Sequence, residues 1–176
     1  MTLVRNSGWR SSRRTIIGAV GAVSVCVMAP TASAQWTVVN LQPAGGTSSS
    51  AYGVGGGQQV GYAHVMGGAI NSASLWSGTA ASWVDLHPAG ATYSSAYGVG
   101  GGQQVGYAAV GGANRASLWS GTAASWVDLQ PAGALLSYAN SVFGAQQVGG
   151  ANVGSAWHAS LWRENVPSAV ESGRRR

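Results

Sequence analysis

Histidines, serines and carboxylates are the residues of this sequence with types suited to catalysis. A Ser-His-Asp triad requires one of each to converge on a substrate. The three histidines, His64, His87 and His158, lie at three different positions of a repeated unit described below. No constant spacing therefore pairs a histidine with a serine or an aspartate, and we expect no catalytic triad.

The sequence also offers few residues suited to metal binding or glycoside hydrolysis. Asp85 and His87 are the nearest candidates for metal ligands, but Gln130 stands where the next unit would repeat His87, and zinc requires a cluster of ligands. We expect no metal and no cofactor. Asp85, Asp128 and Asn40 share one repeat position, so they do not form the unlike carboxylate pair of a glycosidase. We interpret them as acceptors for turn amides.

The N-terminal residues 1–34 have the pattern of an export signal. A basic stretch precedes an apolar run at 15–28, and small residues end at Ala34. This order is typical of a cleaved signal peptide, with Gln35 as the first mature residue. The run is shorter than the roughly 20 residues that span a bilayer, so we expect no stable membrane insertion. The mature protein is predicted to be secreted, periplasmic or on the cell surface.

The charges and the cysteine lie mostly at the ends of the chain. Cys26, the only cysteine, falls in the apolar run, so disulfides and thiolate metal sites are excluded from the mature part. Five arginines and four carboxylates remain there, and three of these arginines end a segment, 167–176, predicted to be a disordered basic tail. The body has no basic stripe, and we expect no nucleic-acid partner.

Internal repetition dominates the mature sequence. Residues 51–63 recur letter for letter at 96–108, and residues 73–86 recur at 116–129. The two offsets differ by two residues, which places an insertion in a tolerant loop within 64–72. A divergent third copy keeps the same order of motifs as far as Trp162. We therefore predict one domain, 35–166, made of three units of about 43 residues.

Each unit contains four short segments rich in Val, Tyr, Trp and Leu, which is typical of β-strands. No sustained helical periodicity is present, so the fold class is predicted to be all-β. Gly100-Gly101-Gly102 lies between two such segments and precedes no helix, which favours a hairpin over a phosphate-binding loop. In the second unit the strands are expected at 96–99, 104–108, 116–119 and 125–129.

The two ends of the repeat region are complementary. The third unit lacks a fourth strand after Trp162, whereas residues 38–41 align with the fourth-strand residues 83–86. We expect the N-terminal strand, within 36–41, to complete the last unit and close a ring. Such closure removes an unpaired edge.

The order of motifs resembles the HAF family of extracellular repeats. Its strands correspond to 96–99, 103–106, 158–162 and 127–129. The resemblance implies an extracellular, bacterial, propeller-like fold without naming an activity. Ser160 departs from the family by standing where it has Phe, and three units are fewer than propellers usually have. A β-trefoil, a β-prism and a disordered Gly/Ser/Ala-rich chain remain the alternatives.

The recurring aromatic residues suggest binding. Trp76, Trp119 and Trp162 are interpreted as core. Trp83 and Trp126 are expected to lie with Asp128 on the wetter face of the fourth strand, opposite Val127 and Leu129, as stacking platforms for sugar rings. Tyr62 and Tyr107 are further candidates for such platforms. The predicted function is an exported, non-enzymatic module that binds carbohydrate or a cell-surface component, or has a structural role. The alternative is a secreted, glycan-directed hydrolase.

Export gives the first test. In a suitable bacterial host the protein should appear outside the cytoplasm with Gln35 at its N-terminus, measured by intact mass. Retention of residues 1–34 on exported protein would contradict the signal. Arg13 and Arg14 resemble a twin-arginine core, so changing both to Lys should stop export only if that route is used rather than the general secretory one.

Overall fold

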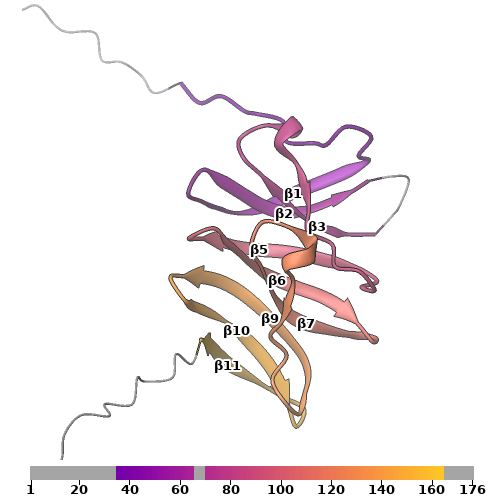
Figure 1. Ribbon diagram of the computed structural model, residues 1–176, viewed down its shortest axis with the longest axis vertical. Helices are drawn as coiled ribbons and strands as arrows, with labels where there is room; N and C mark the ends of the chain where they lie inside the picture. The colour runs from indigo at the N-terminus through magenta and orange to yellow at the C-terminus, as the bar shows by residue number, and fades with distance from the viewer. Residues whose placement is uncertain (1–34, 66–69, 165–176) are drawn as a thin grey trace, which may run out of the picture. The chain divides into compact units, whose positions relative to one another are not determined.

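The computed structural model describes residues 35–65 and 70–164. The predicted signal at 1–34 and the tail at 167–176 lie outside these residues. The chain divides into one unit at Met1–Trp36 and a second, compact unit at Thr37–Arg176. The second unit contains three antiparallel sheets, which confirms the all-β class (Figure 1).

Each sheet is a meander whose neighbouring strands follow each other along the chain. The first sheet comprises β1 (Ser48–Gly55), β2 (Gln58–His64), β3 (Ser72–Trp76) and β4 (Val84–Asp85). The second comprises β5 (Ser94–Gly100), β6 (Gln103–Val110), β7 (Ala113–Trp119) and β8 (Val127–Asp128). The third comprises β9 (Ala134–Phe143), β10 (Gln146–Val153) and β11 (Ala156–Arg163).

Local sequence accounts for the turns. Gly101 and Gly102 have φ of 60° and 79° between β5 and β6, which matches the positive φ that a two-residue hairpin turn requires. The hairpin prediction is confirmed. The part of the chain that the structure describes contains no α-helix, only the single 3₁₀ turns η1 (Ala80–Ser82) and η2 (Ala123–Ser125). Within that part, no helix has the length and apolarity to cross a membrane.

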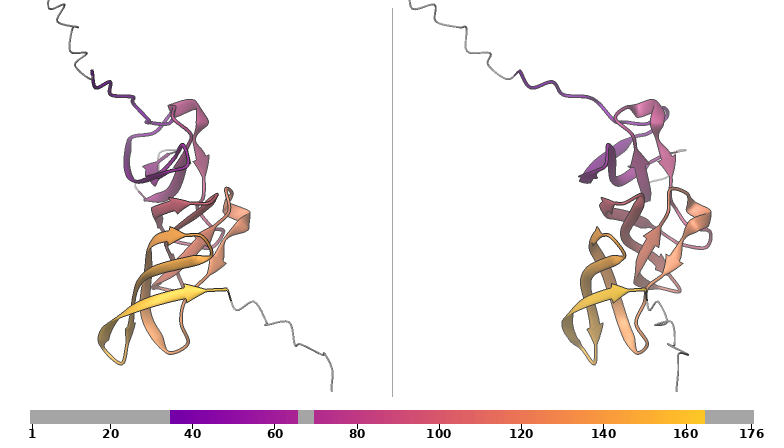
Figure 2. Two further views of the ribbon diagram at one scale, coloured as in Figure 1. Left: turned by 90° about the vertical axis from the view of Figure 1, so that its left-hand side faces the viewer. Right: turned by 60° about the vertical axis from the view of Figure 1, so that its left-hand side comes forward.

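The three sheets stack face to face, with the second between the other two (Figure 2). Their first strands approach each other closely, because β1 packs on β5 and β5 packs on β9. A Cβ placed on Gly53 would lie 2.5 Å from the Tyr97 carbonyl oxygen, and one on Gly98 would lie 2.9 Å from the Asn140 carbonyl oxygen. Glycine is therefore required where these backbones meet.

Apolar side chains fill the two spaces between sheets. Both clusters draw equivalent positions from their own pair of sheets, so the same packing occurs twice. The first contains Val60, Ala73, Leu75, Leu86, Ala96 and Trp119, with Val99 and Trp126 against it. The second contains Val105, Ala116, Ala139 and Val142, with Leu118, Leu129 and Trp162 against it.

Hydrogen bonds between sheets repeat in the same way. The Ser94 hydroxyl accepts the Ala73 N–H at 2.9 Å, and the Ser137 hydroxyl accepts the Ala116 N–H at 2.8 Å. Both serines are fully buried. Each bond joins the third strand of one sheet to the first strand of the next, so it fixes the relative position of the sheets as well as satisfying a buried amide.

The predicted closure by the N-terminal strand is wrong within one chain. Residues 36–41 form no strand, Val38 is 95% exposed, and the third sheet has three strands among the described residues. The segment leads directly into β1 of the first sheet, and the second sheet separates the first from the third. The described residues form no closed barrel, which a β-trefoil would require.

The close packing of the first strands predicts that a side chain added on β5 destabilises the fold more than the same side chain added at the equivalent position of β9. Gly98→Val should lower the free energy of unfolding by about 3 kcal/mol or more, because the new side chain must separate the second and third sheets. Ser141→Val is the matched control, since Ser141 occupies the equivalent position on β9 and is exposed. Its effect should stay within about 0.5 kcal/mol. Equal effects in urea denaturation would contradict the packing argument.

Candidate binding surfaces

Tryptophans at the end of each third strand lie in or against the core. Trp76 and Trp119 are fully buried, and Trp162 packs on the second cluster with its indole N–H donating to the Leu129 carbonyl at 2.7 Å. Each ring contributes a large apolar area to the packing. The predicted core role is confirmed for Trp76 and Trp119, while Trp162 is partly buried.

Trp83 and Trp126 take a different, repeated position beside the fourth strand. The Trp83 indole N–H donates to the Ser74 hydroxyl at 3.0 Å, and the Trp126 indole N–H donates to the Ser117 hydroxyl at 2.9 Å. Both rings are partly buried. The inner edge of each ring is thus fixed by a hydrogen bond while part of its surface stays accessible.

The burial expected from alternation beside β8 is correct for Leu129, which packs against the second cluster, and for the exposed Asp128, but it is wrong for Val127 and Trp126. Val127, predicted to face the core, is 47% exposed, whereas Trp126 packs against the first cluster. The equivalent Val84 on β4 is exposed too, at 36%, and both β4 and β8 are the last, edge strands of their sheets, so exposure at this position belongs to the sheet edge.

Each of these tryptophans lines a shallow pocket. The pocket at Trp83 has a volume of about 440 Å³, and the one at Trp126 has about 540 Å³. Both combine a tryptophan, two alanines of the 3₁₀ turn and the proline of the connection that leads into the sheet. The lining residues that correspond between them are Gln42, Pro43, Ala44, Ala80, Ala81 and Trp83, and His87, Pro88, Ala89, Ala123, Ala124 and Trp126.

Sequence reasoning found the tryptophans of these pockets but missed their proline and alanine walls. The Pro-Ala-Gly motif follows each fourth-strand segment at a constant distance, and that spacing was the available signal. Its place beside the tryptophan depends on how the chain turns from one sheet into the next.

Tyr62 and Tyr107 belong to a row of aromatic rings that crosses all three sheets. Tyr107 is 8% exposed, with Tyr97 at 5.6 Å and Tyr138 at 5.2 Å between ring centroids. Its ring is covered by protein and offers little surface to a ligand. Tyr62 is partly buried against Tyr52. The row runs through Tyr62, Tyr52, Tyr97, Tyr107, Tyr138 and Trp157.

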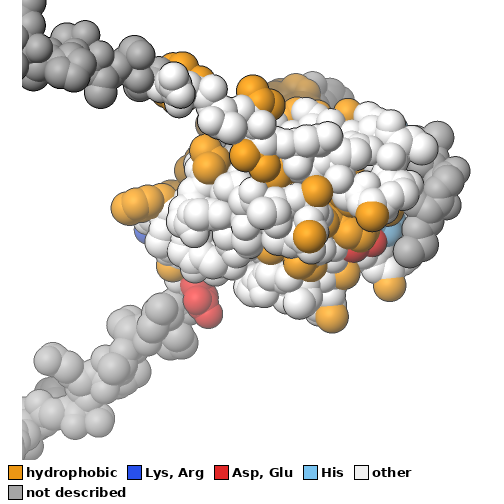
Figure 3. Space-filling view, turned by 90° about the horizontal axis from the view of Figure 1, so that it is seen from above, with side chains coloured by type: hydrophobic (Ala, Val, Ile, Leu, Met, Phe, Trp, Pro, Cys, Tyr) orange, Lys and Arg blue, Asp and Glu red, His pale blue; other side chains and the backbone are white. Residues whose placement is uncertain are grey.

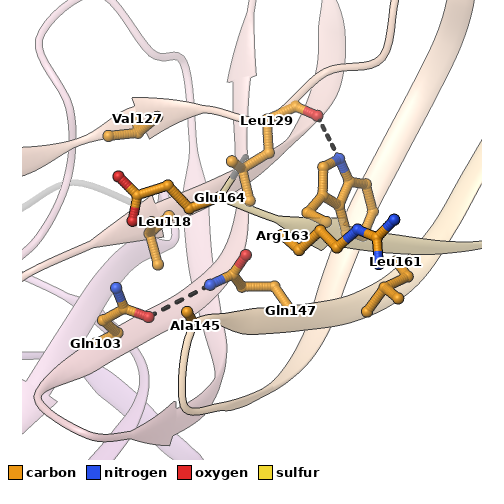
Figure 4. A pocket seen from close by; sticks show the side chains of 10 residues that line it. Gln103, Leu118, Val127, Leu129, Ala145, Gln147, Leu161, Arg163 and Glu164 are labelled. Atoms are coloured by element: carbon orange, nitrogen blue, oxygen red, sulfur yellow. Dashed lines mark hydrogen bonds between the residues drawn. The ribbon is translucent and has the colours of Figure 1, made fainter. Parts of the chain in front are cut away.

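A larger pocket, about 660 Å³, lies between the second and third sheets beside β11 (Figure 4). Leu118, Val127 and Leu129 line it from the second sheet, and Leu161 and Trp162 line it from the third. In the second sheet, the equivalent edge of β7 is paired with β8. Among the described residues the third sheet has no strand beyond β11, so the pocket lies where the second sheet has its fourth strand, and we do not assign it a small ligand.

One histidine and serine pair has the distance of a catalytic pair but the wrong surroundings. His87 Nδ1 lies 2.8 Å from the Ser94 hydroxyl, and His87 Nε2 lies 3.1 Å from the Ala91 carbonyl oxygen. Ser94 is fully buried, so a substrate has no access to it. No carboxylate orients the ring, as a triad requires.

The equivalent residue Gln130 explains the role of His87. Gln130 donates to the Ala134 carbonyl at 2.7 Å and accepts from the Ser137 hydroxyl. His87 makes the corresponding two contacts in its own unit. The two side chains therefore hold the same turn, and the pair at His87 is structural.

The turn interpretation of the shared acidic position is confirmed. Asn40, Asp85 and Asp128 each accept, through Oδ1, the backbone N–H two residues later, at 2.8, 2.8 and 2.9 Å. Asp128 also forms an ion pair with Arg115 at 2.8 Å. The residues for which positions are described include no group of three His, Cys, Asp or Glu side chains arranged to hold a metal ion.

Comparisons with known proteins give no family and no function for this chain. No known protein family, curated protein or solved structure matches the chain.

The buried tyrosines predict alkaline sensitivity. Burial raises the pKa of Tyr107 above its ordinary value of 10, and the neighbouring Tyr97 adds to the effect. The folded protein therefore holds this proton more tightly than the unfolded chain does, so stability is full below pH 10 and falls as the pH rises through the raised pKa. Tyr107→Phe should reduce the loss of unfolding free energy between pH 8 and 11 in urea denaturation. An unchanged loss would contradict this assignment.

Proposed function

We propose that the protein is an exported, non-catalytic module of propeller-like blades that binds carbohydrate of a cell surface through Trp83 and Trp126. The observation that carries this proposal is the repeated pocket, in which a hydrogen-bonded indole lies beside a proline and two alanines. A flat aromatic surface with small apolar neighbours suits the apolar face of a sugar ring. Export and the HAF-like, propeller-like character remain part of the same proposal.

Repetition supports binding at more than one point. The two pockets are built from equivalent residues, so they present the same chemistry twice on one chain. Two weak sites on one molecule bind a repeating polymer more tightly than either site alone, provided that the spacing allows both to engage. A polysaccharide offers such repeats.

The choice of a binding module over a hydrolase depends on two features: whether a polar cluster occurs in one unit only, and whether a substrate can reach it. Catalysis usually needs one cluster of polar groups open to the substrate. The contact most similar to a catalytic pair involves the buried Ser94, and the same turn is held by Gln130 in the next unit. The open pockets contain mainly apolar walls.

The test blocks the pockets without removing core contacts. Ala81 and Ala124 are exposed wall residues of the two pockets. Ala81→Glu and Ala124→Glu should each weaken binding to a surface polysaccharide found on a glycan array. The double variant should abolish it, with melting temperature changed by less than about 2 °C because surface changes have small effects.

Phe143→Ala provides the matched control, because Phe143 is 89% exposed and lies outside both pockets. It should leave polysaccharide binding unchanged. Full binding by the double glutamate variant would overturn the proposal, and so would the absence of any glycan that binds the unaltered protein.

A further inference from the structure

Both ends of the stack present an uncovered sheet face. Gly53 and Gly55 direct their Cβ positions toward the second sheet, so Val54 between them points away, with 77% of its surface exposed. Trp162 packs toward the second sheet, so alternation directs Leu161 beside it to the opposite face, where it is 54% exposed and also reaches the pocket at the open β11 edge. Figure 3 looks onto the first-sheet end, where apolar side chains are scattered and charged ones are sparse.

We propose that these two faces bind each other in separate copies of the chain, and that residues 38–41 of one copy pair with β11 as a fourth strand of the third sheet of another. The contact is head to tail, joining the third sheet of one molecule to the first sheet of the next. It is independent of the carbohydrate pockets.

Each end face carries the apolar residues that form one side of the contact between neighbouring sheets inside the molecule. On the third sheet, Val148, Ala159 and Leu161 correspond to Val60, Ala73 and Leu75, which are buried between the first and second sheets. On the first sheet, Ala51 and Val54 correspond to Ala96 and Val99, which pack against those three residues. The ends therefore carry complementary surfaces of a contact that the molecule already makes twice.

The polar groups of the two end faces also correspond to those that form hydrogen bonds between sheets inside the molecule. Ser49 corresponds to Ser94 and Ser137, which accept an alanine N–H from the preceding sheet. Ser49 already donates to Gln42, as Ser137 does to Gln130. Its equivalent donor is the N–H of Ala159, on the third sheet. The Ala159 amide, exposed in a single chain and buried on association, would thus find on the other copy the kind of acceptor that Ala73 and Ala116 have within the chain.

The strand exchange has a defined register. In the first sheet, β4 pairs with β3 so that Val84 lies opposite Leu75 and Asp85 lies opposite Ser74. The equivalent pairing sets Val39 opposite Leu161 and Asn40 opposite Ser160. Asn40 already bonds the Gln42 amide as Asp85 bonds that of His87. The segment therefore has the local turn of a fourth strand and lacks only a partner edge.

One difference weakens the end contact. Ser141 and Phe143 stand where the second sheet has Gly98 and Gly100, and a Cβ on either glycine would lie 2.9 Å from a carbonyl oxygen of β9. The first sheet of another copy therefore cannot approach the third as closely as the sheets within one chain approach each other. We expect reversible association that depends on concentration.

Sedimentation velocity of the purified protein over a range of concentrations tests the proposal. The mass should increase with concentration, either to a closed oligomer or to a growing series, because a head-to-tail contact permits both. Val54→Asp and Leu161→Asp should each weaken association at least about 100-fold, since each places a charge in an apolar contact. Leu135→Asp, at a residue 60% exposed on neither end face, is the matched control and should associate normally.

Mixing the two variants separates head-to-tail contact from alternatives. Val54→Asp keeps an intact third-sheet face and Leu161→Asp keeps an intact first-sheet face, so the mixture should form one-to-one dimers although each variant alone is monomeric. Association of Val54→Asp alone would indicate pairing of two third-sheet faces and would overturn the proposal. A monomeric unaltered protein would overturn it too, including the case in which residues 165–176 cover the edge.

Engineered cysteines test the register. Asn40→Cys combined with Ser160→Cys should give a disulfide between chains under mild oxidation, because directly opposed strand residues have the spacing that a disulfide requires. Val39→Cys with Ser160→Cys is the control, since neighbouring strand residues point to opposite faces. Equal crosslinking by both pairs would contradict the proposed strand.

Discussion

The close approach of successive first strands is the constraint on which the rest of the structure depends. Gly53 and Gly98 leave no side chain where the backbone of one sheet meets the backbone of the next. This contact brings the apolar residues of the second and third strands into reach of the neighbouring sheet, where they form two equivalent clusters. Without disulfides in the described part of the chain, packing and hydrogen bonds must supply the stability.

The contacts between sheets join apolar burial to a few repeated polar links. Ser94 and Ser137 satisfy amides that would otherwise be buried without an acceptor. A face that carries both the apolar residues and the unused half of such a link is specified for one kind of neighbour, because a generic apolar surface would leave the polar group unsatisfied. This is why the uncovered ends indicate another copy of the same chain rather than any apolar partner.

The same repetition gives the molecule its candidate binding surfaces. Trp83 and Trp126 are fixed by serines on the third strand and lie beside the prolines of the connections, so each pocket is formed by segments that enter and leave one sheet. The pockets at Trp83 and Trp126 involve neither Val54 nor Leu161. Binding through the pockets and association through the end faces can therefore occur together, and association would multiply the number of pockets presented to a polymer.

Local sequence determined the first three strands of the second unit, the Gly101-Gly102 turn and the side-chain bonds of Asn40, Asp85 and Asp128, because these depend on neighbours a few residues away. The fourth strand, expected at 125–129, is shorter, Val127–Asp128, because the 3₁₀ turn η2 extends to Ser125. Tertiary structure decided the rest. Alternation could not reveal that Trp126 is packed and Val127 exposed, since burial on an edge strand such as β8 depends on how far the neighbouring sheets cover it, and the equivalent Val84 on β4 is exposed as well. Alignment identified residues 38–41 as a fourth strand, but whether they reach the third sheet depends on the second sheet lying between, a spatial relation that no local pattern encodes.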